Sequence, residues 1–297
     1  MDYKEFLNAV VDEIGDYLLD CDFEDVSVRP IEKNNGVLLQ GLMLRKKDAP
    51  VAPNIYMEYY YSMYESGASM ETVLAEIAAE YRRASSVLSE GEYADFSKDA
   101  YEDHVFLRVV NYKKNEPSLR NMPYILFHDL AVTFRYLTKV SGDGVSSTAV
   151  ENSDLVKWGE DVDHLFELAK VNTLKLFPPR IERLDTLIAR LLTEGACPVP
   201  EGAETGIYVL TNTSNINGAT SMLLPEAMEL ASREVGEDFY ILPSSVHELL
   251  LVPEKSFPDR EGLERMVYEI NRSVVSEMDY LSDSVYHFDT VGMKMTL

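Results

Sequence analysis

Cysteine is the scarcest chemically reactive residue in this 297-residue chain. Its two cysteines, Cys21 and Cys197, are too few to form a metal site by themselves. Two thiols in a chain of this length are typical of a reducing compartment and not of a disulfide framework. The sequence therefore predicts no disulfide between them.

Long apolar runs are also missing. No window comes near the ~20 uninterrupted apolar residues that a membrane-spanning helix needs. The chain opens Met1-Asp2-Tyr3-Lys4-Glu5, without the basic and then apolar segments of a signal peptide. We therefore expect a cytoplasmic protein with no membrane partner.

Positive charge is in short supply. The chain has 27 Lys and Arg against 51 Asp and Glu, which gives a formal net charge of −24. Nucleic-acid affinity rests largely on cations that displace condensed counterions, so this balance predicts no direct binding to nucleic acid. The acidic excess serves either solubility and repulsion between copies or a surface for a basic partner, and the composition leaves both open.

Motifs for common cofactors and catalytic sites are absent. The sequence has no Walker A loop, no GxGxxG, no GxSxG elbow and no EF-hand loop. Its five histidines show no HxH or HxxxH spacing, and no CxxC accompanies them. These absences predict no cofactor and no native metal site, and they favour a protein that is not an enzyme.

Two short segments nevertheless combine residue types used in acid–base and nucleophilic catalysis. His128-Asp129 offers a base beside an acid, although neighbours on a strand point to opposite faces. Ser245, His247 and Glu248 fall within one hexapeptide, but on a strand Ser245 and His247 would lie about 7 Å apart, too far for a hydrogen bond without a turn. These five residues are the candidate catalytic set. A hydrolase-like enzyme would assemble His128, Asp129, His247 and Glu248 across a sheet.

The N-terminal third is predicted to form a helix, a hairpin and further helices. Asp2 and Glu5 have the spacing of a capping box, and the residues that follow carry an apolar stripe of helical period: Phe6, Val10, Ile14, Leu18 and Cys21. Residues 24–31 and 37–45 read as strands joined at Asn34-Asn35-Gly36, and Pro30 marks either an edge strand or the end of the first strand. The tyrosine-rich segment 51–67 has helical spacing at Ile55, Tyr59, Tyr60 and Met63, so most of its rings should pack on the core.

The remainder mixes hairpin-linked strands with helices. Residues 104–112 read as a strand, Asn115-Glu116-Pro117 as a break, residues 122–140 as two adjoining antiparallel strands, and 150–194 as two helices joined by Pro178-Pro179. The C-terminal part adds strands at 207–212, 239–242 and 246–253, with helices begun by Pro225 and Asp259. Without regular βαβ alternation the fold class is α+β, with mostly antiparallel sheets and packed helices. The glycine- and proline-rich interval 195–206 predicts a linker between an N-terminal region, 1–194, and a C-terminal unit, 207–297.

Several segments resemble an uncharacterised bacterial family known only as a domain of unknown function. Its strongest marks are NNGxxLxGL from Asn34, NTxxLFP from Asn172 and ILPSSxHE from Ile241. The resemblance implies no activity, cofactor or catalytic residue. The segments that carry it are 34–45, 52–67, 122–137, 164–178, 210–212 with 217–219, and 239–253.

The acidic residues are concentrated locally. Residues 1–29 hold nine acids against two bases, and residues 151–170 hold six against two. On the first predicted helix Asp12, Asp16 and Asp20 lie mainly off the apolar stripe, which makes them candidate interaction residues. The leading hypothesis is a non-enzymatic cytoplasmic protein whose acidic surface binds a basic protein. An inhibitor that mimics nucleic-acid phosphates is a further alternative, and the oligomeric state is not predicted.

Overall fold

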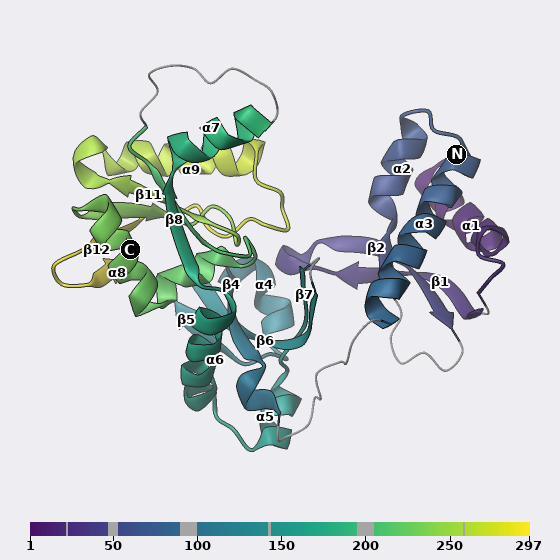
Figure 1. The fold of residues 1–297 in the computed structure, drawn as a ribbon, viewed down its shortest axis with the longest axis horizontal. Helices are drawn as coiled ribbons and strands as arrows, with labels where there is room; N and C mark the ends of the chain where they lie inside the picture. The colour runs from purple at the N-terminus through teal and green to yellow at the C-terminus, as the bar shows by residue number, and fades with distance from the viewer. Residues whose placement is uncertain (22, 47–52, 90–99, 142–143, 195–204, 258) are drawn as a thin grey trace. The chain divides into compact units, whose positions relative to one another are not determined.

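The computed structural model describes residues 1–297 except 22, 47–52, 90–99, 142–143, 195–204 and 258 (Figure 1). Its contacts divide the chain into two compact units, Met1–Tyr93 and Ala94–Leu297, called unit 1 and unit 2. The linker predicted at 195–206 falls mostly outside the described residues. The strands before and after this interval, residues 179–183 and 208–212, pair with each other in one sheet. Both strands therefore belong to unit 2, and the contacts divide the chain after Tyr93.

Unit 1 is a three-stranded antiparallel sheet packed with helices, in the order β1-β2-β3. The predicted hairpin is confirmed, with Asn35 and Gly36 at positive φ in its turn and Pro30 on the edge strand. The elements are α1 (Tyr3–Glu13), η1 (Ile14–Tyr17), β1 (Phe23–Glu32), η2 (Asn34–Gly36), β2 (Leu38–Lys46), β3 (Asn54–Tyr56), α2 (Met57–Glu65) and α3 (Met70–Ser89).

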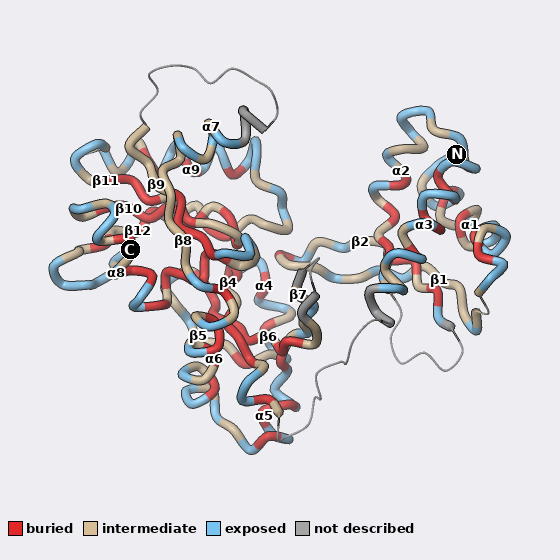
Figure 2. Tube along the Cα trace, in the orientation of Figure 1, coloured by how far each residue is buried: buried red, intermediate tan, exposed pale blue. Residues whose placement is uncertain are grey.

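The predicted apolar stripe forms the core of unit 1. The Asp2–Glu5 capping box begins α1, and Phe6 and Val10 on α1 belong to the same buried apolar cluster as Ile77 and Tyr81 on α3. Both helices carry buried positions along their length (Figure 2). The tyrosine-rich segment differs from the prediction because its helix starts only at Met57. Ile55 therefore lies in β3, and Tyr59 is 66% exposed while Tyr60 is buried.

Unit 2 combines two antiparallel sheets, one with strands β4, β5, β6 and β7 and one in the order β13-β12-β10-β11-β9-β8. Together the described residues bear out the α+β class. Its strands are β4 (Val105–Asn111), β5 (Tyr124–Phe127), β6 (Leu130–Ser141), β7 (Gly144–Ala149), β8 (Pro179–Arg183), β9 (Tyr208–Asn212), β10 (Phe239–Leu242), β11 (Leu249–Pro253), β12 (Tyr286–Asp289) and β13 (Lys294–Thr296). Its helices are η3 (Tyr101–Asp103), α4 (Tyr112–Leu119), α5 (Asn152–Trp158), α6 (Val162–Leu176), α7 (Leu184–Glu194), η4 (Gly218–Leu223), α8 (Pro225–Val235), η5 (Glu254–Ser256) and α9 (Arg260–Ser273).

Three predictions for unit 2 need correction. The prolyl pair does not join two helices directly, because Pro179 begins β8, an edge strand where a missing N–H is tolerated. The segment after β4 is helix α4 despite Pro117, with Asn111 capping its first turn. Strand β11 begins only at Leu249, so residues 246–248 belong to the loop before it.

Helix α6 is fixed to β4 by polar side chains. Thr173 Oγ1 accepts a hydrogen bond from the Leu107 backbone N–H at 2.9 Å, and Asn172 Nδ2 donates to the backbone oxygens of Glu102 and Val105. All the helices in the described part of the chain are too short or too polar to cross a bilayer.

We expect Phe6→Ala to destabilise unit 1 by about 3–5 kcal/mol, because it leaves a cavity beneath α1. Trp158, the only tryptophan, is buried in unit 2 against Tyr101 and reports on that unit. Denaturant unfolding followed by far-UV circular dichroism should show the loss, while the Trp158 fluorescence transition stays in place. The matched Phe239→Ala variant in the core of unit 2 should shift the Trp158 transition. If Phe6→Ala shifts the Trp158 fluorescence transition as much as Phe239→Ala does, the two units unfold together.

The ion pair between His164 and Glu160 should give stability a definite pH dependence. His164 Nδ1 lies 2.5 Å from Glu160 Oε2, and the hydrogen bond that the imidazole donates to this carboxylate raises the pKa of His164. Hydrogen bonds from Tyr101 and His164 lower the pKa of Glu160. The contribution of His164 is thus present below its unfolded pKa of about 6.5 and is lost as the pH rises through its folded pKa. His164→Gln should cost more stability at about pH 5.5 than at about pH 9 in urea unfolding, and the difference should vanish in a Glu160→Gln background.

Candidate functional site

The carboxylate of Asp129 is the centre of a polar cluster in unit 2. Its Oδ2 accepts from Ser282 Oγ at 2.5 Å and from Ser284 Oγ at 3.2 Å, and its Oδ1 accepts from the Tyr286 hydroxyl. Asp129 lies in the turn between β5 and β6, whereas Tyr286 begins β12. Three hydroxyl donors thus join the two sheets of unit 2 through one carboxylate.

Protonated phenols keep this cluster together at neutral pH. Burial, followed by the hydrogen bond to Asp129, raises the pKa of Tyr286 far above its ordinary value. Burial and the charge of Asp283 raise the pKa of nearby Tyr280 to about 12. Tyr286 therefore remains a donor, and the lone pairs of Asp129 are used to hold chain segments together.

His128 and Asp129 form the two-residue turn between β5 and β6. The prediction that they lie on a strand is therefore wrong. His128 has φ 53°, and its exposed imidazole packs against the rings of Phe127 and Tyr286, with centroids 4.8 and 5.2 Å away. Among the hydrogen bonds of the described residues none joins the His128 ring to Asp129. The two residues are adjacent in the chain, but no hydrogen bond among the described residues lets Asp129 orient the His128 imidazole.

His247 pairs with a carboxylate that the sequence did not single out. Its Nε2 lies 3.2 Å from Asp279 Oδ1, and its buried Nδ1 has no hydrogen-bond partner among the described residues. Ser245 Oγ accepts from the His247 backbone N–H at 3.0 Å, so it does not donate to the imidazole in that bond. Glu248 forms no ion pair within the described part of the chain. The structure therefore separates the candidate residues into Asp129 with its hydroxyls and His247 with Asp279.

The segment from Pro243 to His247 is fixed by its backbone on both sides. Its Pro243, Ser244 and Val246 bond to the backbone of residues 279–282. On the other side Thr211 Oγ1 donates to the His247 carbonyl at 2.8 Å, and a Cβ at Gly218 would lie 2.2 Å from that same oxygen. The close approach requires glycine at 218.

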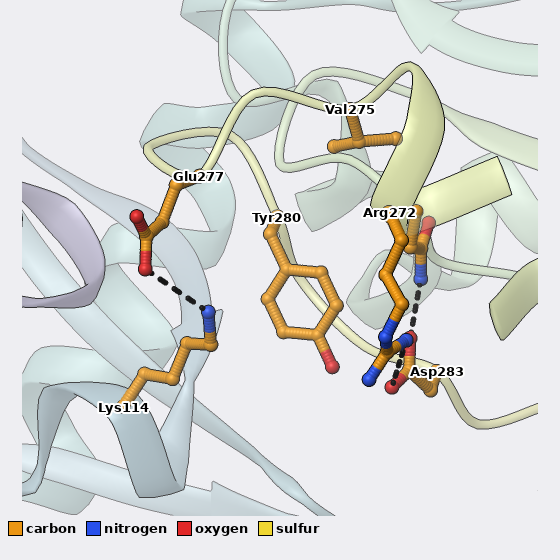
Figure 3. A pocket seen from close by; sticks show the side chains of 7 residues that line it. Lys114, Arg272, Val275, Glu277, Tyr280 and Asp283 are labelled. Carbon is orange, nitrogen blue, oxygen red and sulfur yellow. Dashed lines mark hydrogen bonds and ion pairs between the residues drawn. The ribbon is translucent and has the colours of Figure 1, made fainter. Parts of the chain in front are cut away.

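A pocket of about 310 Å³ lies between Lys114 of α4 and residues 271–283 (Figure 3). Two ion pairs line it, Lys114–Glu277 at 3.6 Å and Arg272–Asp283 at 3.5 Å, and the Tyr280 ring lies between them. Lys114 Nζ is 4.6 Å from the centre of that ring. Its lining residues are Lys114, Asn271, Arg272, Val275, Glu277, Tyr280 and Asp283. Because both cations already face carboxylates, a ligand would have to present both signs of charge to displace them.

Three side chains elsewhere in unit 2 could hold a cation. Asp238, Glu254 and His287 each offer one ligand atom within 4.8 Å of the others, at the ends of β10, β11 and β12. Asp238 Oδ1 already accepts from the backbone and hydroxyl of Thr290, which leaves its other oxygen for a metal. The trio comes from three separate segments, so no sequence spacing could have indicated it.

The family model for a family of unknown function, DUF5688, matches residues 3–290. The chain belongs to this family. No curated protein and no solved structure matches the chain. The polar clusters of this DUF5688 chain must therefore be interpreted from their own geometry.

Sequence reasoning missed most partners in these clusters. It named Asp129 and His247 but not Asp279, Ser282, Ser284 or Tyr286, because their contacts bridge more than 30 residues. The three candidate interaction residues lie in unit 1 of the DUF5688 chain. Asp12 lies in the last turn of α1 and Asp16 lies in η1, both exposed, while Asp20 pairs with Arg82 at 3.0 Å.

We expect Asp129→Ala to destabilise unit 2 by about 3 kcal/mol or more, because three hydroxyls lose their acceptor. Tyr286→Phe removes one of these bonds and should cost about 1 kcal/mol. The exposed Asp163, substituted by Ala, is the matched control and should stay within about 0.5 kcal/mol of wild type. Urea unfolding followed by Trp158 fluorescence measures all three. A loss in Asp129→Ala no greater than in the control would show that the carboxylate does not hold the sheets together.

Proposed function

We propose that the chain is a non-enzymatic, cytoplasmic binding protein that engages a basic protein through the acidic segment of unit 1, residues 12–20. The observation that carries the proposal is that several carboxylates of this segment are exposed and have no ion-pair partner among the described residues. Asp12, Glu13 and Asp16 are exposed and form no ion pair among the described residues. The segment itself contains neither Lys nor Arg, and the ion pair of Arg82 with Asp20 offsets only part of its negative charge.

The arginines of unit 1 are already engaged in ion pairs. Each of its four arginines pairs with a carboxylate of the same unit: Arg29 with Asp25, Arg45 with Glu24, Arg82 with Asp20 and Arg83 with Glu80. Lysine or arginine from another protein is therefore the natural counter-ion for the acids that remain. Asp20 contributes less than Asp12 and Asp16, because Arg82 shares its charge.

An exposed leucine gives the acidic segment an apolar contact. Leu19 is 84% exposed beside Asp20. Interfaces combine an apolar anchor that loses its water with charged groups that set orientation and association rate. Leu19 supplies the anchor, and the flanking aspartates supply the steering field.

The alternative of a hydrolase has less support in the geometry. Such an enzyme would need His128, Asp129, His247 and Glu248 together, yet Asp129 is saturated by hydroxyl donors and His247 faces Asp279. The alternative of a nucleic-acid mimic is a special case of the proposal, in which the basic partner is itself a nucleic-acid-binding protein.

Reversing the charges of Asp12, Asp16 and Asp20 to Lys should weaken binding of the partner. The partner is first captured from the native host at low salt and purified, and its dissociation constant is then measured by calorimetry. Affinity should fall steeply between about 50 and 500 mM salt, because exposed charges are screened over ~10 Å or less in that range. The matched control reverses Glu226, Glu229 and Glu234, exposed on α8 of unit 2, and changes the net charge equally.

Leu19→Ser separates specific binding from general acidity. It should weaken the complex at every salt concentration without changing how steeply the affinity falls with salt, since it removes an apolar contact and no charge. Circular dichroism should show all variants folded. If the α8 control weakens binding as much as the variant of the acidic segment, or if Leu19→Ser has no effect, the acidic segment is not the contact surface.

A further inference from the structure

Two arginines share one face of the sheet formed by β4 and β6. The register pairs Arg108 with Thr133 and Phe106 with Arg135, so Arg108 and Arg135 are diagonal neighbours on that face. Phe106, beside Arg135, belongs to one buried apolar cluster, and Val110, two residues beyond Arg108, belongs to another. The guanidinium groups therefore lie on a strip between two apolar patches, where sheet residues are ordinarily hydrophobic.

The two guanidinium groups differ in how they are held. Arg135 is fixed by Ser147, to which its Nε and Nη2 donate at 3.2 Å (Oγ) and 2.6 Å (backbone O). Arg108 Nε is buried and has no hydrogen-bond partner among the described residues. No carboxylate within the described part of the chain forms an ion pair with either arginine. The guanidinium group of Arg135, which hydrogen bonds hold in place, thus neighbours the guanidinium group of Arg108, whose Nε has no partner among the described residues.

The surroundings do not compensate these charges fully. Burial lowers the pKa of Arg108, and burial together with the charge of Arg108 lowers the pKa of Arg135 to about 10. Both remain cationic at neutral pH. Asp279 is the acid that acts on Arg108, but its carboxylate is already bonded to His247 and Ser276. A purely structural role would leave two like charges and a buried donor unsatisfied, which is costly.

We propose that Arg108 and Arg135 form a binding site for an oxyanion, the phosphate or carboxylate group of a small molecule. Planar guanidinium forks match the oxygens of such groups, and one oxyanion would satisfy the Arg108 donor and offset both charges. A chain of net charge −24 repels an extended polyanion, so the ligand is compact and reaches the site by its local charge. The site lies in unit 2 and is independent of the acidic segment.

The test is calorimetric titration of the full-length protein with sodium phosphate and, separately, with sodium acetate, at constant ionic strength in chloride. We expect saturable 1:1 binding of at least one of them, with a dissociation constant of ~1 mM or tighter. Arg108→Met should weaken it by about 10- to 100-fold, as expected for loss of a charged hydrogen-bond partner. The matched control, Arg265→Met, removes an exposed arginine that faces Asp259 and Glu261 and should bind as wild type does.

The unliganded protein gives a second readout. Without the anion, Arg108→Met should melt at a higher temperature than wild type, because an uncompensated buried charge is gone while the aliphatic stem remains. If Arg108→Met does not fold, Arg108→Lys replaces it in the titration, since Lys keeps the charge but loses the fork and should still bind more weakly. Binding of phosphate alone assigns a phosphate group, and binding of acetate assigns a carboxylate. No saturable binding of either anion, or equal affinities in the Arg108 and Arg265 variants, would overturn the proposal.

Discussion

The hydrogen bonds of Asp129 are the constraint on which unit 2 depends. They tie the turn between β5 and β6 to the start of β12, and so join two sheets that have no strand in common. The same bonds hold the segment that precedes β12. This segment contains Asp279, which pairs with His247, and it contains Glu277, Tyr280 and Asp283, which line the pocket. The carboxylate accepts from three hydroxyls, so most of its lone pairs are used in bonds that hold these segments together.

The segments that carried the resemblance in the sequence have the same character. Asn172 and Thr173 bind the backbone at the start of β4, and Thr211 binds the carbonyl of His247. Gly218 lets the backbone of η4 approach that carbonyl. These are side chains and a glycine that satisfy or accommodate buried backbone, which the interior of a protein requires. They therefore identify a fold without identifying a reaction.

Local features of the fold were predictable because their causes are local. The Asp2–Glu5 capping box, the positive φ of Asn35 and Gly36, and the four residues of β10 depend on neighbours within a few positions. Helix α4 was missed because Pro117 indicated a break, and β8 was missed because its pairing partner β9 lies beyond residue 206. The adjacency of Arg108 and Arg135 depends on the register of two strands, which the hydrophobic pattern of a single strand cannot give.

The acidic segment and the arginine pair respond differently to solvent, and this distinguishes their roles. Charges at Asp12 and Asp16 are exposed, so salt screens them and any complex they steer must be sensitive to ionic strength. The Nε atom of Arg108 is enclosed, and a low local dielectric strengthens its attraction for an anion that reaches it. Binding by unit 1 should therefore be governed by ionic strength. Binding at the arginine pair should be governed by the chemical identity of the anion, because the geometry of the fork, and not long-range attraction, selects what fits.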